Sequence, residues 1–368
     1  MRIAEIRVYR IDLPVLGGPY RMALSELTAL DSTVVEIVAD NGLIGYGESC
    51  PLGPVYQPQH AGGARAALAE MAPGLIGCDP RRIGALNLRM DRLLAGHRYA
   101  KAAIDVALWD LTGRAYGARV CDLLGGALRE SLPSYYAIGI LPPEQAARVA
   151  REKQAQGFRR LQLKVGGRDI DEDIAAVRLV CESLEPGVSL AADANRGWTR
   201  RDVLLLSQAC REQRFVIEQP CASYEECLSL RGRLCHPLYL DEVVEDLPTV
   251  LRAIGDRAAD GFGMKLSRVG GLSAMRSIRD VCAVAGLPMS CDDSWGGDIA
   301  AAACLHIGAT VQTHLCEGVW VAAPYIEGHY DAIDGPHIEA GQLRLPGGPG
   351  LGIAPRAEAL GEPVASYH

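Results

Sequence analysis

The chain has 368 residues, of which 49% are hydrophobic and 22% charged, and its formal net charge is −8 at pH 7. This composition is typical of a globular protein with a sizeable core, and the length exceeds that of one ordinary domain. The negative charge argues against a nucleic-acid partner, because such proteins usually present a basic face. No apolar run reaches membrane-spanning length, so we expect no membrane partner either.

The twelve cysteines are scattered along the chain without a Cys-x-x-Cys pair, which argues against a thiolate zinc site. Several of them, such as Cys282 and Cys304, lie in apolar helical patterns typical of small core residues. Residues 1–14 alternate like a strand and lack the apolar core of a signal peptide. We therefore expect a cytoplasmic protein with reduced thiols.

Residues 1–130 are predicted to form a small α+β domain. Residues 3–13 have the pattern of a strand, and residues 32–39 and 43–48 alternate around a turn, Asp40-Asn41-Gly42, that is typical of a hairpin. Helical periodicity then dominates, and the predicted helices fall within residues 61–77, 80–96 and 99–117. The Pro/Gly-rich loops at residues 14–26 and 49–63 are long enough to act as lids.

Residues 131–345 show a different rhythm, in which short apolar runs alternate with amphipathic helical segments. The runs are residues 132–139, 159–167, 188–195, 214–220, 237–242, 261–267, 287–293 and 310–318. Eight β/α repeats of this length predict a TIM-type (β/α)8 barrel with parallel strands buried on both faces. The alternative is a doubly wound open sheet, but no G-x-G-x-x-G motif supports nucleotide binding. Residues 346–368 are predicted to return to the N-terminal domain.

Three of the predicted barrel strands, the third to the fifth, end in carboxylates. Asp193, Glu218 and Asp241 are 25 and 23 residues apart, one in each β/α unit. Adjacent parallel strands lie about 4.8 Å apart, so the three acids would crowd together at the catalytic face of the barrel. An all-oxygen cluster of this kind suits a hard divalent cation, which we predict to be Mg²⁺. The alternative is three surface acids that happen to end strands.

Two lysines end the second and sixth predicted strands, on opposite sides of an eight-stranded ring. Lys164 and Lys265 would flank the barrel axis, with the acids on one side between them. Two bases that face each other suit proton transfer at a carbon from either face. Burial and a nearby metal charge would lower the pKa of each lysine, so that a neutral amine can act as the base. Solvated strand ends are the alternative.

The strings 192-ADAN, 217-IEQP, 240-LDE and 264-MKLSRVGGL together resemble the muconate-lactonizing and mandelate racemase-like branch of the enolase superfamily. The resemblance covers essentially the whole chain and implies an N-terminal capping domain followed by the barrel. It also implies that Asp193, Glu218 and Asp241 bind the metal and that Lys164 and Lys265 form the acid/base pair. One departure is Gln162, which replaces the first lysine of the usual Lys-x-Lys and should leave the pKa of Lys164 higher than usual.

The loops and the last two predicted strands contain the residues that would determine which substrate binds. Aromatic faces beside a carboxylate can form a cage for a cationic ammonium group, although either tryptophan could instead be packing. The predicted substrate-binding residues are Tyr56, Gln162, Asn195, Asp292, Asp293, Trp295 and Trp320. The strings 290-SCDDSWGGDIAAA and 317-EGVWVAAPYI are similar to those of the hydroxyproline betaine 2-epimerases, which implies that Trp320 and Asp292 lie near the ammonium.

The predicted function is therefore a Mg²⁺-dependent 2-epimerase of a proline-derived carboxylate with a cationic ammonium, most simply 4-hydroxyproline betaine or proline betaine. The alternatives are a cis-3-hydroxy-L-proline dehydratase, which 161-LQLKVGG and 192-ADANRGWTR also resemble, and a dipeptide epimerase. A non-enzymatic alternative is a betaine-binding protein on an inactive scaffold, although all three acids and both lysines are present. The family resemblance further implies a symmetric homo-oligomer, such as the octamers and dimers often found in the family.

Overall fold

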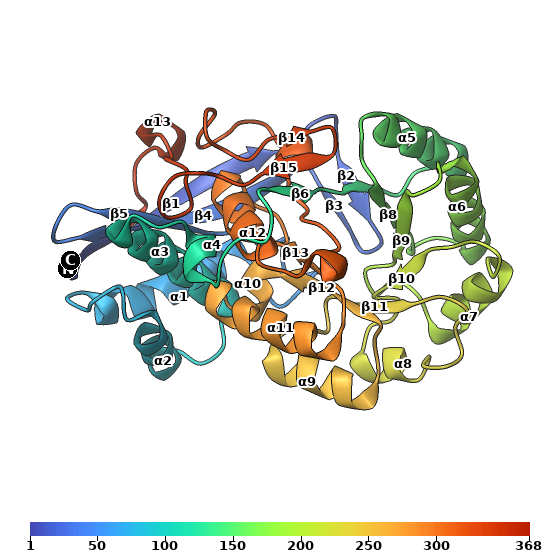
Figure 1. Ribbon diagram of the computed structural model, residues 1–368, viewed down its shortest axis with the longest axis horizontal. Helices are drawn as coiled ribbons and strands as arrows, with labels where there is room; N and C mark the ends of the chain where they lie inside the picture. Colours follow the sequence, from blue (N-terminus) through green and yellow to red (C-terminus); the bar gives the residue numbers. More distant parts are fainter.

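The computed structural model describes residues 1–368 and places an N-terminal sheet with its helices beside a larger barrel (Figure 1). The N-terminal sheet is antiparallel and consists, in order, of β16 (Ala365–Tyr367), β1 (Ile3–Pro14), β4 (Ala29–Ala39) and β5 (Ile44–Ser49). The turn between β4 and β5 contains Gly42 with a φ of 82°, as expected of a tight hairpin. Because β16 pairs with β1, the end of the chain is part of the N-terminal sheet.

The helices of the N-terminal domain are α1 (Ala61–Met71), η1 (Ala72–Leu75), α2 (Ile83–Leu93), α3 (Arg98–Tyr116) and the short α4 (Val120–Leu123). Helix α3 is the central one, since nearly all of its residues are buried. It packs closely against β5, because a Cβ atom on Gly47 would lie only 1.8 Å from the carbonyl oxygen of Ala103. The glycine is therefore required by the close approach of strand and helix.

Seven parallel strands form the barrel sheet, in the order of the chain. They are β7 (Tyr136–Ile138), β8 (Arg160–Lys164), β9 (Ser189–Asp193), β10 (Val216–Glu218), β11 (Leu238–Leu240), β12 (Gly261–Lys265) and β13 (Met289–Asp292). The intervening and following helices are α5 (Pro143–Ala155), α6 (Ile170–Ser183), α7 (Arg200–Ala209), α8 (Tyr224–Leu228), α9 (Leu247–Asp256), α10 (Leu266–Val269), α11 (Leu272–Ala285) and α12 (Asp298–Gly308).

The eighth predicted strand is not a regular strand, and this part of the prediction was wrong. Residues 310–318 begin with the 3-10 helix η2 (Thr313–Leu315) and continue as a short extended connection. This connection closes the barrel through single bridges, because Glu317 N donates to Met289 O at 2.9 Å and Val319 N donates to Pro133 O at 2.9 Å. Gly318, with a φ of 107°, lies outside the strand region, which explains why no continuous ladder forms.

Between β1 and β4, a small hairpin extends from the N-terminal domain to the barrel. It consists of β2 (Tyr20–Met22) and β3 (Ser25–Leu27), and it lies beside the carboxyl ends of the first barrel strands (Figure 1). It is tied to barrel residues by the Ile140 N–H, which donates to Arg21 O at 3.1 Å. The loop predicted at residues 14–26 therefore contains an ordered hairpin beside the barrel.

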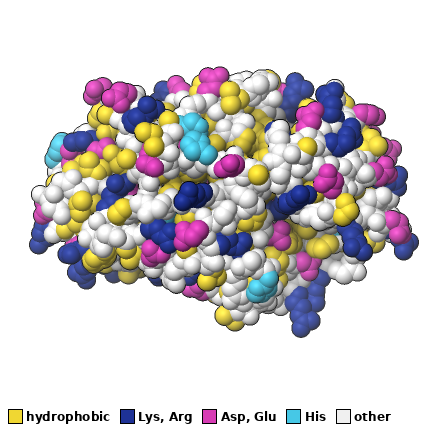
Figure 2. Space-filling view, turned by 45° about the horizontal axis from the view of Figure 1, so that its top comes forward, with side chains coloured by type: hydrophobic (Ala, Val, Ile, Leu, Met, Phe, Trp, Pro, Cys, Tyr) yellow, Lys and Arg dark blue, Asp and Glu magenta, His cyan; other side chains and the backbone are white.

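After the barrel, the chain forms η3 (Ala323–Tyr325), β14 (Ile338–Glu339), β15 (Gln342–Arg344) and α13 (Ala357–Leu360). Strands β14 and β15 form a three-stranded sheet with β6 (Ser131–Pro133). No helix combines the length and the apolarity that crossing a membrane would require. Acidic and basic side chains are interspersed over the face shown in Figure 2, without a single-sign patch.

Candidate active site

The ionisable residues at the strand ends converge, as the barrel geometry predicts. Lys164 and Asp193 are register partners at the ends of β8 and β9, and Asp193 is in turn paired with Glu218 on β10. Lys265, at the end of β12, lies opposite Lys164, because β9, β10 and β11 separate the two lysine strands. The two ammonium groups therefore approach one cavity from opposite sides of the barrel.

Three carboxylates form the centre of the site. Asp193, Glu218 and Asp241 are buried, and each offers an oxygen that lies within 4.8 Å of the others. Burial and the charges of Asp193 and Asp241 raise the pKa of Glu218 to about 7. Since like charges at this spacing oppose ionisation, a cation among the three acids would stabilise their charged forms, and an all-oxygen donor set fits a hard divalent ion.

Polar groups orient each of the three carboxylates. Gln162 Nε2 donates to Glu218 Oε2 at 2.9 Å, and Asn195 Nδ2 donates to Asp193 Oδ2 at 3.1 Å. Arg268, fully buried, donates to Asp241 Oδ1 at 2.5 Å. Burial alone would raise the pKa of Asp241, but the charges of Arg268 and Lys265 outweigh it and hold that pKa below its ordinary value.

A fourth buried acid, Glu242, lies beside the triad. Its Oε1 accepts a hydrogen bond from Asn195 at 3.0 Å, whereas its Oε2 has no hydrogen-bond partner. Burial and the nearby charges of Asp241 and Asp193 raise the pKa of Glu242 to about 8. The side chain of Asn195 thus links two acids, and its backbone, with a φ of 42°, is held in the left-handed region where strain is common at functional sites.

The lysine environments differ from the sequence-based expectation. Burial would lower the pKa of Lys164, but Asp193, at 2.5 Å from its Nζ, outweighs that effect and raises it. Burial acts the same way on Lys265, and Asp241 at 3.7 Å and Asp292 at 3.3 Å raise its pKa well above the ordinary value. The expected lowering of the lysine pKa values includes the charge of a bound cation; in the protein alone, the neighbouring carboxylates outweigh burial for both lysines.

The lysines open into a small cavity between the barrel and the N-terminal segments. Of the predicted substrate-binding residues, those that line it are Tyr56, Gln162, Asn195, Asp293, Trp295 and Trp320. Further parts of the wall come from Tyr20 and Met22 of the β2–β3 hairpin and from Leu52 of the loop after β5. Both loops that the sequence suggested as lids therefore supply side chains to this cavity.

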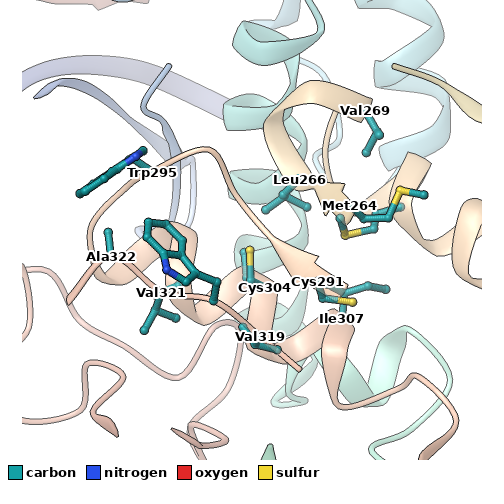
Figure 3. Close-up of a cluster of buried hydrophobic side chains, with 14 of the residues drawn as sticks. Met264, Leu266, Val269, Cys291, Trp295, Cys304, Ile307, Val319, Val321 and Ala322 are labelled. Atoms are coloured by element: carbon teal, nitrogen blue, oxygen red, sulfur yellow. The ribbon is translucent and has the colours of Figure 1, made fainter. Parts of the chain in front are cut away.

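Aromatic rings form one wall of the cavity. Trp295 meets Trp320 edge to face at 5.3 Å between ring centroids, and Tyr20 meets Trp295 in the same manner at 5.6 Å. Figure 3 shows Trp295 at the edge of an apolar cluster that includes Cys291, Cys304 and Val319. The indole Nε1 of Trp320 and the hydroxyl of Tyr20 are buried without hydrogen-bond partners. The wall thus combines apolar faces with two free polar groups.

The two consecutive aspartates at the end of β13 have different positions. Asp293 lines the cavity, where Ser267 N donates to its Oδ1 at 3.2 Å and burial raises its pKa to about 6. Asp292 does not line the cavity, and its side chain is fully buried beside Lys265. The structure therefore does not place Asp292 where an ammonium in the cavity would meet it.

The residues of the site that were not identified in the sequence include Tyr20, Tyr135, Glu242 and Arg268. Arg268 lies within the 264-MKLSRVGGL string, and Glu242 directly follows Asp241 at the end of the run 237–242. Arg268 lies in the four-residue helix that follows a strand end, and nothing in the sequence indicates that its side chain is fully buried. The sequence also does not show that Tyr20 and Tyr135 line the same cavity.

Comparison with known proteins was made on the whole chain. Residues 5–125 match the family model of the mandelate racemase/muconate lactonizing enzyme N-terminal domain, and residues 145–359 match that of the enolase C-terminal domain-like family. A cis-3-hydroxy-L-proline dehydratase from Roseibium aggregatum is 42% identical over 100% of both chains. An N-succinyl-L-Arg/Lys racemase from Bacillus cereus is 26% identical over 98% of both chains.

Solved structures agree with this similarity. A member of the enolase superfamily from Roseovarius nubinhibens ISM, crystallised with magnesium, has a TM-score of 0.95 and 36% sequence identity, covering 100% of this chain and 99% of its own. The fold, including the N-terminal domain over the barrel, is thus shared along the full length.

Proposed function

The chain belongs to the mandelate racemase/muconate lactonizing enzyme branch of the enolase superfamily, and from this premise we propose that it dehydrates cis-3-hydroxy-L-proline. The pair of buried lysines on opposite sides of one small cavity supports proton transfer at the α-carbon, which dehydration and epimerisation share. The full-length similarity to a dehydratase of that substrate carries the proposal, and favours dehydration over the epimerisation that the sequence alone suggested.

The stereochemistry of the substrate suits two opposed lysines. In a cis-3-hydroxy-proline the hydroxyl and the carboxylate share one ring face, so the α-hydrogen lies on the opposite face from the hydroxyl. One lysine, as the neutral amine, removes the α-proton, while the other, as the ammonium, protonates the departing hydroxyl from the other face. Water and a cyclic enamine result, and the enamine tautomerises to an imine.

Asp193, Glu218 and Asp241 would hold the divalent cation, which we propose to be Mg²⁺. Such a cation supplies electrostatic stabilisation of the negative charge that develops on the substrate carboxylate as the α-proton leaves. Gln162, Asn195 and Arg268 keep the three acids in place through the hydrogen bonds described above. The charged groups of the site are buried, which strengthens the charge interactions among them.

A second candidate is 2-epimerisation of a proline-derived betaine. The aromatic wall favours it, because Trp295, Trp320 and Tyr20 present ring surface to the cavity and rings attract quaternary ammonium groups. Epimerisation needs the same two lysines, one to remove the α-proton and the other to return a proton on the opposite face. The two candidates therefore differ in the substrate and in the fate of the intermediate rather than in the catalytic residues.

The test is a dehydration assay with cis-3-hydroxy-L-proline and, as a matched control, trans-3-hydroxy-L-proline. In the trans isomer the hydroxyl lies on the same face as the α-hydrogen, out of reach of the second lysine. We expect rapid water loss from the cis isomer alone, and loss of that activity in both Lys164→Ala and Lys265→Ala. Equal rates with the two isomers, or full activity in either lysine variant, would contradict the two-lysine mechanism.

A further inference from the structure

The carboxylate of Asp292 is held by contacts within the protein to both of its oxygens. Its Oδ1 accepts the Trp320 backbone N–H at 2.7 Å, and its Oδ2 accepts the Ser290 hydroxyl at 2.5 Å and the Tyr135 hydroxyl at 2.8 Å. Lys265 Nζ lies 3.3 Å from the same Oδ2. Both oxygens thus accept hydrogen bonds from the protein, and the fully buried Asp292 side chain does not line the cavity.

The Tyr135 side chain is itself held in place by Arg160. The guanidinium of Arg160 lies over its ring at 4.2 Å from the centroid, and Arg160 NH1 donates to Glu317 O at 3.1 Å. Tyr135 immediately precedes β7, the first strand of the barrel sheet, whereas Asp292 ends β13, the last strand. The hydrogen bond between them therefore connects the two ends of the sheet where the barrel closes. Burial raises the pKa of the Tyr135 hydroxyl, which therefore remains a donor.

The two lysines differ in their carboxylate partners. The closest carboxylate partner of Lys164 is Asp193, which belongs to the three-acid cluster. Lys265 contacts one acid of that cluster, Asp241, but its closer partner is Asp292, which does not belong to it. Only Lys265 therefore has a dedicated carboxylate, with hydrogen bonds of its own to hold it in place.

From these contacts we infer that Asp292, oriented by the Tyr135 hydroxyl, is a positioning residue that fixes the Lys265 ammonium on its face of the substrate. The inference rests on the two-lysine chemistry proposed above and adds to it an asymmetry. Proton transfer on the substrate face next to Lys265 depends on the Tyr135–Asp292 contact, whereas proton transfer on the face next to Lys164 does not. A misplacement of about 1 Å in a reacting group can reduce a rate by about 100-fold, so the contact has a measurable effect.

The experiment separates the two faces by using the two enantiomers of proline, which lack a leaving hydroxyl. Held by the same carboxylate, L-proline and D-proline present their α-hydrogens to opposite lysines. Exchange of each α-proton is followed by proton NMR in D₂O with Mg²⁺, and the enantiomer whose exchange Lys265→Ala abolishes identifies the Lys265 face. We expect Tyr135→Phe to slow exchange of that enantiomer about tenfold and that of the other less than twofold.

Two further variants make the result specific. Asp292→Asn keeps the shape of the side chain but removes its charge, and should slow exchange on the Lys265 face about 100-fold. Tyr239→Phe is the matched control, because the Tyr239 hydroxyl is bonded to Glu317 Oε1 at 2.9 Å and makes no contact with Asp292. It removes an equivalent buried hydroxyl and should change exchange of both enantiomers by the same factor.

Equal slowing of both enantiomers by Tyr135→Phe, or no slowing of either, would overturn the positioning role. Dehydration of cis-3-hydroxy-L-proline by the wild-type protein is measured in parallel and reports on the proposed function separately. Face-selective slowing without any dehydration would support the positioning role and refute the substrate assignment. Absence of exchange with both enantiomers in the wild-type protein would refute the two-lysine premise, and the inference with it.

Discussion

Acidification should destabilise the fold through one buried histidine, His306. Its Nδ1 accepts the Cys121 N–H at 3.2 Å and its Nε2 donates to Leu351 O at 3.0 Å. It thus joins α12 of the barrel to α4 and to the C-terminal return, and it has no solvent contact. This environment suits the neutral ring, and burial lowers the pKa of His306 from 6.5 to about 4.

The magnitude follows from the difference between the two pKa values. Between pH 6.5 and 4 the unfolded chain binds a proton at His306 that the folded chain does not, so stability is fully present above pH 6.5 and is lost as the pH falls to about 4. At about 1.4 kcal/mol per pKa unit, the free energy of unfolding should fall by about 3 kcal/mol over this window.

The assay is urea denaturation of wild-type protein and His306→Asn at several pH values from 7.5 to about 4.5. The variant keeps an acceptor for Cys121 but leaves Leu351 O without its donor, so it should be less stable at pH 7.5 by about 1–3 kcal/mol. Its stability should nevertheless depend less on pH, and the exposed His314→Asn should retain the wild-type dependence. Parallel pH curves for wild type and His306→Asn would refute the reasoning.

Three further outcomes are expected. Removal of divalent cations with EDTA should abolish activity and lower the melting temperature, and added Mg²⁺ should restore both; retained activity after complete chelation would contradict the metal proposal. Arg268→Met leaves the buried Asp241 without its guanidinium partner and should lower the free energy of unfolding by about 3–5 kcal/mol in urea melts, whereas a loss below 1 kcal/mol would contradict the pairing. Gly47→Ala should yield little folded protein because its Cβ would overlap a backbone oxygen of α3, whereas Gly84→Ala, with open space around it, should raise stability by about 0.5–1 kcal/mol on thermal melting.

The catalytic end of the barrel was predictable because it depends on spacing. Parallel strands bring their carboxyl ends to one face, so Lys164, Asp193 and Glu218 meet whenever the strands are assigned correctly. The acids at these ends could be identified without knowing any side-chain conformation. The family resemblance along the whole chain was likewise confirmed by the two domain matches.

Other features depend on exact positions that a sequence pattern does not define. Successive strand residues alternate in direction, so Ser290 and Asp292 share the barrel interior, while Asp293, just beyond the strand, reaches the cavity. An error of one residue at a strand end therefore exchanges the roles of two aspartates. Tyr135 contacts Asp292 only because the barrel closes, and that closure uses an irregular segment whose pattern resembles a strand.

The central claim is most directly tested by proton NMR in D₂O with Mg²⁺ on a mixture of cis-3-hydroxy-L-proline and trans-4-hydroxy-L-proline betaine. Both compounds compete for one site, so a single sample reports the preference. We predict that the 3-hydroxy amino acid loses water while the betaine keeps its α-proton signal. Loss of the betaine α-proton with growth of its epimer, and an unchanged 3-hydroxy amino acid, would contradict the dehydratase assignment.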